Sequence, residues 1–254
     1  MASNPQNTAF VLVPGSFSLP GFYHKIVPLL QSHGYLVLPT ALQSAGERPQ
    51  GPATFDEDAA YIASTIKRLA NEGKNVVLAM NSYGGFPGTE ATKGLSKKER
   101  EAKGEKGGVV ALVYLASFLP KVGQSLRASM GEDLPDSIKN AGEYMKLNYE
   151  EDYKGIFSDL PEDIGKHYMN QMINHSPISF SGELTYPGYL HIPTTYFLTE
   201  GDLIIPPETQ EQMVDMVKGL GGELKVVRSK AGHVPMLSVP DEVVSVLVEA
   251  AEGK

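Results

Sequence analysis

Short apolar runs alternate with segments of helical spacing along most of this chain, and this alternation narrows the folds that it can adopt. Strands that alternate with helices pair in parallel, and the helices then cover both faces of the sheet. We therefore expect an α/β protein with a mostly parallel six-stranded sheet flanked by helices. The predicted strands cover residues 9–13, 35–38, 75–80, 109–116, 194–199 and 224–227.

The helices expected between these strands carry recognisable end signals. A helix is predicted over residues 22–33, and Gly34 stands in the position that commonly follows a helix. Thr54 and Glu57 have the spacing of a capping box, which predicts a helix start at that point. A last amphipathic helix is expected from Pro240, because a proline in the first turn has no N–H to leave unpaired.

Two segments interrupt the alternation. Residues 96–106, SKKEREAKGEK, are dense in charge and are expected to form a solvated surface insertion. Residues 119–190 carry no strand signal but are rich in tyrosine and methionine. A structureless stretch of that length is uncommon in a compact domain. We therefore predict that residues 119–190 form a helical cap on a core made of residues 1–118 and 191–254.

The composition excludes several classes of function. A net charge of -8 and a pI of about 5.3 argue against nucleic acid or an anionic membrane as the partner. The absence of cysteine excludes disulfides, a thiolate nucleophile and cysteine-bound metals. The start MASNPQNT has no signal-peptide segment, and no apolar run approaches a membrane span, so a cytoplasmic protein is expected. No metal-ligand spacing and no phosphate- or dinucleotide-binding glycine motif is present, so neither metal nor cofactor is expected.

A serine, an aspartate and a histidine each follow a predicted strand. Ser82 comes after the third strand in NSYGG, Asp202 after the fifth strand and His233 after the sixth. Sites in an open parallel sheet lie at the carboxyl ends of its strands. Nucleophilic catalysis by serine needs a histidine base and a carboxylate that orients it. We therefore predict that these three residues are catalytic, with Gly84 and Gly85 allowing a sharp turn after the nucleophile.

Such catalysis also needs two N–H donors that face the developing oxyanion. Tyr83, the residue after the predicted nucleophile, is expected to supply one of them. The second is expected from PGSFSLP, residues 14–20, with Phe17 as the first choice and Ser16 as the next. The hydroxyls of Ser16 and Ser18 could also contact a bound substrate.

Four segments make the whole chain resemble the α/β-hydrolase superfamily. They are FVLVPG at 10–15, AMNSYGG at 79–85, LTEGDLIIPPETQ at 198–210 and AGHVPMLSVP at 231–240. Within that superfamily the chain is similar to the branch of plant methyl-ester esterases and hydroxynitrile lyases, and to fungal hydrolases with an M-H-S-Y-G-G motif. The resemblance implies an α/β-hydrolase fold with a helical cap, and serine hydrolase chemistry.

The chain departs from the family pattern at several positions. Met80 replaces the first glycine of the G-x-S-x-G nucleophile elbow, and Asn81 stands where histidine is frequent. Pro14 replaces the histidine of an early His-Gly pair. These differences leave the geometry of the elbow open. Hydroxynitrile lyases of this branch place a lysine near the catalytic histidine, whereas His233 is followed by Val234, so that activity is not expected.

Each catalytic candidate also has a purely structural explanation. Ser82 can be an ordinary turn residue and His233 an ordinary loop residue. Asp202 can be a turn aspartate, and Glu200 then becomes the competing acid. The other histidines follow no strand and are expected to be structural or on the surface, although His175 could reach a substrate from the predicted cap.

Together these features predict a serine hydrolase that cleaves a carboxylic ester or lactone of a hydrophobic small molecule. The aromatic and methionine content of the predicted cap favours such a substrate. The predicted substrate-binding residues are Ser16, Ser18, Asn81, Phe118, Tyr144, Tyr168, Met172 and Val234. Two rival functions remain: a lyase, cyclase or carbon–carbon bond-cleaving enzyme that uses His233 as a proton shuttle, and a non-catalytic receptor for a small molecule. Formation of a homodimer is left open.

Overall fold

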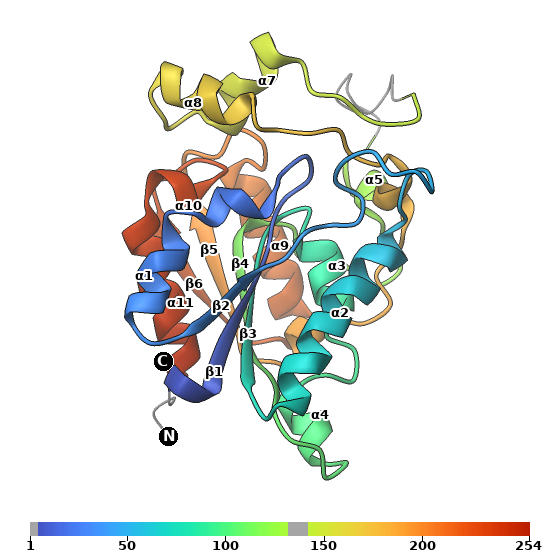
Figure 1. Ribbon diagram of the computed structural model, residues 1–254, viewed down its shortest axis with the longest axis vertical. Coiled ribbons are helices and arrows are strands. Elements are labelled where there is room, and N and C mark those ends of the chain that lie inside the picture. The colour runs from blue at the N-terminus through green and yellow to red at the C-terminus, as the bar shows by residue number, and fades with distance from the viewer. Residues whose placement is uncertain (1–4, 132–141) are drawn as a thin grey trace.

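A single parallel sheet forms the centre of the molecule. The computed structural model describes residues 5–131 and 142–254. All six predicted strands are present and pair in parallel in the order β2-β1-β3-β4-β5-β6 (Figure 1). The strands are β1 Thr8–Val13, β2 Leu36–Pro39, β3 Asn75–Ser82, β4 Gly108–Ser117, β5 Thr194–Thr199 and β6 Leu224–Ser229. The predicted fold class is therefore confirmed.

Helices connect the strands. The α-helices are α1 Ile26–Ser32, α2 Phe55–Asn71, α3 Gly85–Glu90, α4 Lys97–Glu101, α5 Leu126–Ser129, α7 Tyr149–Ile156, α8 Glu162–Met169, α9 Pro207–Gly219, α10 Pro235–Ser238 and α11 Pro240–Glu252. Short 3-10 turns lie at Pro5–Asn7, Pro20–Tyr23, Ile178–Ser181 and Gly188–Leu190. Within the described ranges, none of these helices has the length and apolarity needed to cross a membrane.

The helices form a layer on each face of the sheet. α1 and α11 pack on one face together with Phe10 and Leu12 of β1, whereas α2, α3 and α9 pack on the other with Val11 and Val13 (Figure 1). Successive side chains of a strand point to opposite faces. Every residue of β1 is consequently buried, which explains why residues 9–13 form a continuous apolar run in the sequence.

Two helix predictions have different outcomes. The capping box at α2 is confirmed, because Thr54 and Glu57 each bond the other's backbone N–H, at 2.8 and 3.3 Å. The single helix predicted over residues 22–33 is wrong, since the 3-10 turn Pro20–Tyr23 precedes a shorter helix, α1. Pro28 has no N–H for the carbonyl four residues earlier, so it is accommodated in the first turn of a helix that starts at Ile26.

The charged segment 96–106 is not simply solvated, as the sequence suggested. It contains the helix α4, which begins with a capping box between Ser96 and Glu99. Arg100 is only 2% exposed and donates to the side chain of Asn71 at 2.8 Å. Arg100 also forms an ion pair with Glu105 at 2.8 Å, so one face of this insertion is anchored to the core.

The segment predicted to be a cap is helical where the structure describes it. It contributes α5, α7 and α8 and two of the 3-10 turns. α7 and α8 lie beyond the carboxyl ends of the strands, on the side where the loops after β3, β5 and β6 are found (Figure 1). The division of the chain into a core and a cap at residues 119 and 190 stays a prediction.

Candidate active site

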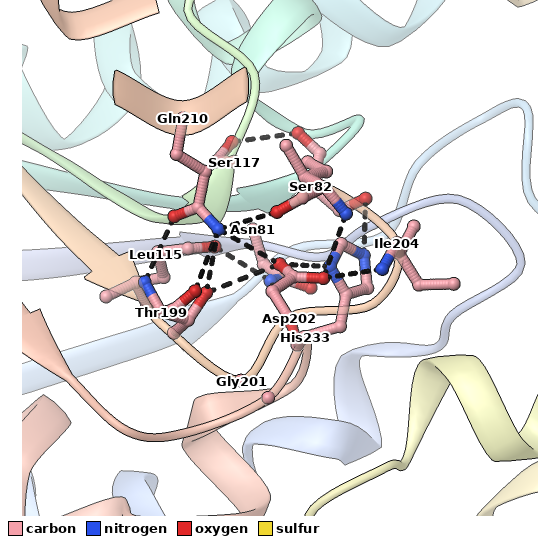
Figure 2. A network of polar contacts seen from close by, with 12 residues as sticks. Asn81, Ser82, Leu115, Ser117, Thr199, Gly201, Asp202, Ile204, Gln210 and His233 are labelled. Carbon is pink, nitrogen blue, oxygen red and sulfur yellow. Dashed lines mark hydrogen bonds and ion pairs between the residues drawn. The ribbon is translucent and has the colours of Figure 1, made fainter. Parts of the chain in front are cut away.

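The three predicted catalytic residues lie together at the carboxyl ends of their strands. His233 Nε2 is 2.9 Å from Ser82 Oγ, and His233 Nδ1 is 2.9 Å from Asp202 Oδ2 (Figure 2). All three side chains are buried, with residue exposures of 7% for Ser82, 5% for His233 and 2% for Asp202. A hydroxyl, an imidazole and a carboxylate in this order form the geometry of a serine nucleophile with its base.

Ser82 stands on a sharp turn between β3 and α3. Its φ of 51° lies in the left-handed region, which an L-residue enters at a cost of about 1–2 kcal/mol. Its carbonyl accepts from Ser117 Oγ at 2.8 Å and from the Phe118 N–H at 3.2 Å, which ties the turn to the end of β4. A Cβ at Gly85 would lie 2.2 Å from the Phe118 carbonyl oxygen, so this close approach requires glycine.

Met80 is accommodated in the elbow by a second glycine. Met80 is fully buried, and a Cβ placed on Gly88 of α3 would lie 2.5 Å from its sulfur. The glycine on the helix therefore provides the space that the strand glycine provides in the G-x-S-x-G pattern. Replacement of that strand glycine by methionine leaves Ser82 within hydrogen-bond distance of His233.

Asp202 is held in a dedicated loop. Its Oδ1 accepts from the N–H groups of Ile204 and Ile205, at 2.8 and 2.9 Å, which leaves Oδ2 directed at His233. Gln210 of α9 closes the loop by donating to the Ile205 carbonyl at 2.7 Å. The competing acid, Glu200, is exposed and faces solvent, so Asp202 alone of the two carboxylates meets the histidine.

The loop that carries His233 is tied down on two sides. The Asn81 amide donates to the His233 carbonyl at 3.1 Å and to the Leu115 carbonyl at 2.8 Å (Figure 2). Asp159, between α7 and α8, accepts the Gly232 N–H at 2.6 Å. Both amide hydrogens of Asn81 are therefore used within the protein, and its contact with substrate through the side-chain oxygen stays a prediction.

The oxyanion-hole prediction needs a correction at Phe17. The Phe17 N–H donates to His175 Nδ1 at 3.3 Å and is therefore occupied within the protein. In the described part of the chain, the N–H groups of Ser16 and Tyr83 have no hydrogen-bond partner. The loop before Ser16 contacts the nucleophile, since a Cβ on Gly15 would lie 2.9 Å from Ser82 Cβ.

The predicted substrate-binding residues occupy different places. Ser18 Oγ lies 3.9 Å from the Met172 sulfur, so these two residues come together beside the loop of Phe17. The Tyr168 hydroxyl lies 3.3 Å from His24 Nε2, and the Tyr144 hydroxyl accepts from the Arg48 N–H at 3.1 Å. Both tyrosine hydroxyls thus bond to parts of the protein outside the triad.

Two other predicted substrate-binding residues pack against the core. The Phe118 ring lies 6.0 Å from the Phe86 ring, and Val234 is buried beside the helix layer of α1 and α11. Among residues 5–131 and 142–254, no group of three or more histidine and acidic residues is arranged to hold a metal ion.

The sequence interpretation missed several buried polar residues around the site. They are Ser44, Asp58, Ser179 and Gln210, each no more than 1% exposed, whereas His175, also buried, was named there only as a residue that could reach a substrate. Gln210 stands four residues into α9 and carries no motif of its own. Asp58 lies in the acidic first turn of α2, where a carboxylate is expected because it interacts favourably with the helix dipole, so nothing in the sequence indicated another role for it. No local pattern distinguished them from surface residues.

The parallel sheet and the Ser-His-Asp arrangement together define the class of α/β-hydrolase folds. A sequence profile described as "Alpha/beta hydrolase family" matches residues 10–246, and the chain therefore belongs to this family. "Probable hydrolase R7" of Phoma sp. is 33% identical over 95% of this chain and 97% of its own length. "Alpha/beta hydrolase nvfD" of Aspergillus novofumigatus is 30% identical over 96% of each chain. The crystal structure of polyneuridine aldehyde esterase shares the fold, with a TM-score of 0.74, 21% identity and coverage of 96% and 99%.

Proposed function

We propose that the protein is a serine hydrolase that cleaves a carboxylic ester or lactone of a hydrophobic small molecule. Membership of the hydrolase family supports hydrolytic activity in general. The observation that carries the finer proposal is the pair of 2.9 Å contacts that join Ser82, His233 and Asp202. A receptor for a small molecule would have no need of this complete arrangement.

In the proposed mechanism, His233 Nε2 takes the proton of Ser82 as Oγ attacks the ester carbonyl carbon. Asp202 accepts the Nδ1–H and stabilises the imidazolium that forms. The imidazolium then gives its proton to the leaving alkoxide, and an acyl-enzyme remains on Ser82. A water molecule, deprotonated by His233, attacks the acyl carbon, and Ser82 leaves with the proton returned by the histidine. The products are a carboxylic acid and an alcohol, or a hydroxy acid from a lactone.

The oxyanion of each tetrahedral intermediate would be bound by the N–H groups of Ser16 and Tyr83. Three observations support these two donors. Tyr83 directly follows the nucleophile, Gly15 contacts Ser82, and neither N–H is used by the described part of the chain. Two N–H donors on opposite sides of a developing charge are the usual form of this stabilisation. Ser16 takes the role that the sequence had assigned first to Phe17.

The non-hydrolytic alternative loses its main argument. It rested on the unusual Met80-Asn81 pair, which departs from the family elbow. Gly88 gives Met80 a packing explanation, and the contacts of Asn81 give it a structural role at the His233 loop. Neither residue is left requiring a different chemistry. A hydrophobic substrate is supported by the apolar surroundings of Met172, which packs against both core clusters.

The proposal is tested by labelling with a fluorophosphonate probe and by turnover of p-nitrophenyl esters of increasing acyl length. Wild-type protein and the His33→Asn variant, which changes an exposed histidine, should both label and turn over. Ser82→Ala should lose labelling and lower kcat by at least about 10⁴-fold. Labelling that persists in Ser82→Ala would assign the nucleophile elsewhere. A preference for short polar esters would contradict the hydrophobic substrate.

A further inference from the structure

Phe17 is bound on both sides by a short segment that lies far away in the sequence. Its N–H donates to His175 Nδ1 at 3.3 Å, and its carbonyl accepts the Ile173 N–H at 2.9 Å. The segment itself is fixed in place. Met145 and His175 exchange both backbone hydrogen bonds, at 2.8 and 3.1 Å, and the Ser176 N–H donates to the Ser44 carbonyl at 2.8 Å.

The hydrogen bonds of His175 determine its tautomer. Because Nδ1 accepts from the Phe17 N–H, the ring proton lies on Nε2, which is 3.2 Å from Ser179 Oγ. Ser179 Oγ gives its own hydrogen to the Ser176 carbonyl at 2.8 Å, so it accepts from the imidazole. His175 is fully buried, and this burial lowers its pKa from 6.5 to about 3. His175 is therefore a neutral imidazole that is hydrogen-bonded at both ring nitrogens, and none of its described contacts is with Ser82.

A second branch of the same network reaches the other proposed oxyanion donor. The Tyr83 hydroxyl donates to Asp58 Oδ2 at 2.8 Å, with a longer contact of 3.4 Å to the Ser179 carbonyl. Asp58 in turn accepts from the N–H and the hydroxyl of Ser44. The Tyr83 and His175 rings pack edge to face with their centroids 5.2 Å apart. The network therefore contacts Phe17, which follows the proposed oxyanion donor Ser16, and Tyr83, which follows the nucleophile and is the other proposed donor.

Phe17 needs this support because of its own backbone. Its φ of 62° is in the left-handed region, which is strained for an L-residue and persists only where the surroundings impose it. The rings of His175 and Phe17, with centroids 5.3 Å apart, add packing to the hydrogen bond. Release of the Phe17 N–H would allow the strained Ser16–Phe17 peptide to rotate. The Gly15–Ser16 peptide, which carries the Ser16 N–H, is joined to it at the Ser16 Cα and would lose its fixed orientation.

We propose that His175 is a positioning residue for the oxyanion hole, and that it acts by fixing the Ser16–Phe17 peptide through the Phe17 N–H. The inference rests on the proposed serine hydrolase function and adds a residue that neither the mechanism nor the family pattern uses. Because the hole binds charge that exists only in the transition state, His175 acts on kcat and leaves substrate binding unchanged.

The matched variants are His175→Leu, His175→Asn and the surface control His33→Asn, assayed with the same p-nitrophenyl ester. Leucine removes both hydrogen bonds, whereas asparagine keeps an acceptor at the position of Nδ1. Loss of one oxyanion donor costs about 10²–10³ in kcat, and a mispositioned donor should cost less. We expect His175→Leu to lower kcat about 10- to 100-fold with KM within about twofold, and His175→Asn to recover much of the loss. The His33→Asn control should match wild type.

Binding of a boronic acid, which forms a tetrahedral adduct on the serine, should weaken in parallel with kcat across these variants. Binding of the carboxylic acid product should not change. If His175→Leu hydrolyses esters at the wild-type kcat, the positioning role is overturned while the hydrolase function stands. If wild type fails to hydrolyse any ester or to label at Ser82, the proposed function is overturned, and this inference with it.

A measurement on wild-type protein removes any dependence on the folding of a variant. Nitrogen-15 spectra of the histidine rings should show His175 with an unprotonated Nδ1 and a protonated Nε2 from pH 8 down to pH 5. The Phe17 amide should be protected from hydrogen exchange. A protonated Nδ1, or a freely exchanging Phe17 amide, would contradict the proposal directly. Ser179→Ala, which leaves the Phe17 bond intact, should lower kcat less than His175→Leu.

Discussion

At the scale of single residues, the buried imidazole of His175 makes stability depend on pH. Its pKa is about 3 in the folded protein and 6.5 ordinarily, because burial disfavours the charged form. Between these values the unfolded chain binds a proton that the folded protein cannot bind. The contribution of the neutral His175 ring to the free energy of unfolding is therefore complete above pH 6.5. It is lost as the pH falls toward 3, by up to about 1.4 kcal/mol per pH unit.

We expect the difference in unfolding free energy between wild type and His175→Asn to shrink as the pH is lowered from 7 to 4. Urea unfolding at several pH values measures this difference. Asp58 lies in the same network, and burial raises its pKa. Its protonation therefore makes the folded protein more stable as the pH falls, which is opposite to the effect of His175. Asp58 is common to both proteins and largely cancels in the comparison. A difference that does not vary with pH would show that His175 titrates normally.

At the scale of elements, Met80 of β3 packs closely against Gly88 of α3. A methyl group at Gly88 would lie 2.5 Å from the Met80 sulfur. We expect Gly88→Ala to lower the free energy of unfolding by about 1–3 kcal/mol through overpacking. Met80→Ala should lower it by about 2–5 kcal/mol through the cavity that it leaves. The double variant should be more stable than the sum of the single changes predicts, because the new methyl group fills part of that cavity.

Urea denaturation of the single and double variants measures this coupling. Gly219→Ala is the matched control, since no atom lies within 4 Å of a Cβ built at that helical glycine. It should leave the protein as stable as wild type or slightly more stable, because alanine has the higher helix propensity. Strict additivity of Met80→Ala and Gly88→Ala would show that the two residues do not share a contact.

The same scale shows what the sequence allowed us to predict. The four central strands are buried and are apolar runs in the sequence, and the edge strands β2 and β6 could be placed from their shorter apolar runs. A capping box predicted the start of α2. Ser82, Asp202 and His233 could be identified because each is a reactive residue type that directly follows a predicted strand, and the structure brings the three together. The structure of the charged segment around α4 was not predicted, because the burial of Arg100 depends on Asn71, far away in the chain.

At the scale of the whole molecule, the network around His175 could not have been predicted. Its members are Phe17, Ser44, Asp58, Tyr83, His175 and Ser179, which come from five separate parts of the chain. Phe17, Tyr83 and His175 were named in the sequence analysis for other roles, but no local pattern indicated that the six residues contact one another, and only the folding of the chain brings them together. The choice of Phe17 as an oxyanion donor was wrong for this reason, since the partner of its N–H lies 158 residues away.

The segment between α7 and α8 is hydrogen-bonded to two loops that lie far from it in the sequence. Ser158 Oγ donates to the Gly201 carbonyl at 3.3 Å, and Asp159 accepts the Gly232 N–H at 2.6 Å. These bonds join the predicted cap to the loops of Asp202 and His233. A hydrogen bond to a charged group contributes about 1.5–3 kcal/mol. We expect Asp159→Ala to lower kcat/KM about tenfold by loosening the His233 loop.

The matched control is Asp163→Ala, which removes an exposed carboxylate of α8 and should leave kcat/KM unchanged. Gly232→Ala tests the same contact from the other side, because its new Cβ would lie 2.7 Å from Asp159 Oδ1. It should reduce kcat/KM in the same direction as Asp159→Ala. Wild-type kinetics in both Asp159→Ala and Gly232→Ala would show that this contact does not position the histidine.

The order of the strands also determines when activity can arise during synthesis. Ser82 is translated 151 residues before His233, which follows β6 at the edge of the sheet. The nascent chain can begin to order from its amino terminus while it is still attached to the ribosome. In the proposed mechanism its serine has no base until β6 and the loop beyond it have left the exit tunnel. If that mechanism holds, the nascent chain cannot hydrolyse an ester before β6 has joined the sheet and brought His233 to Ser82.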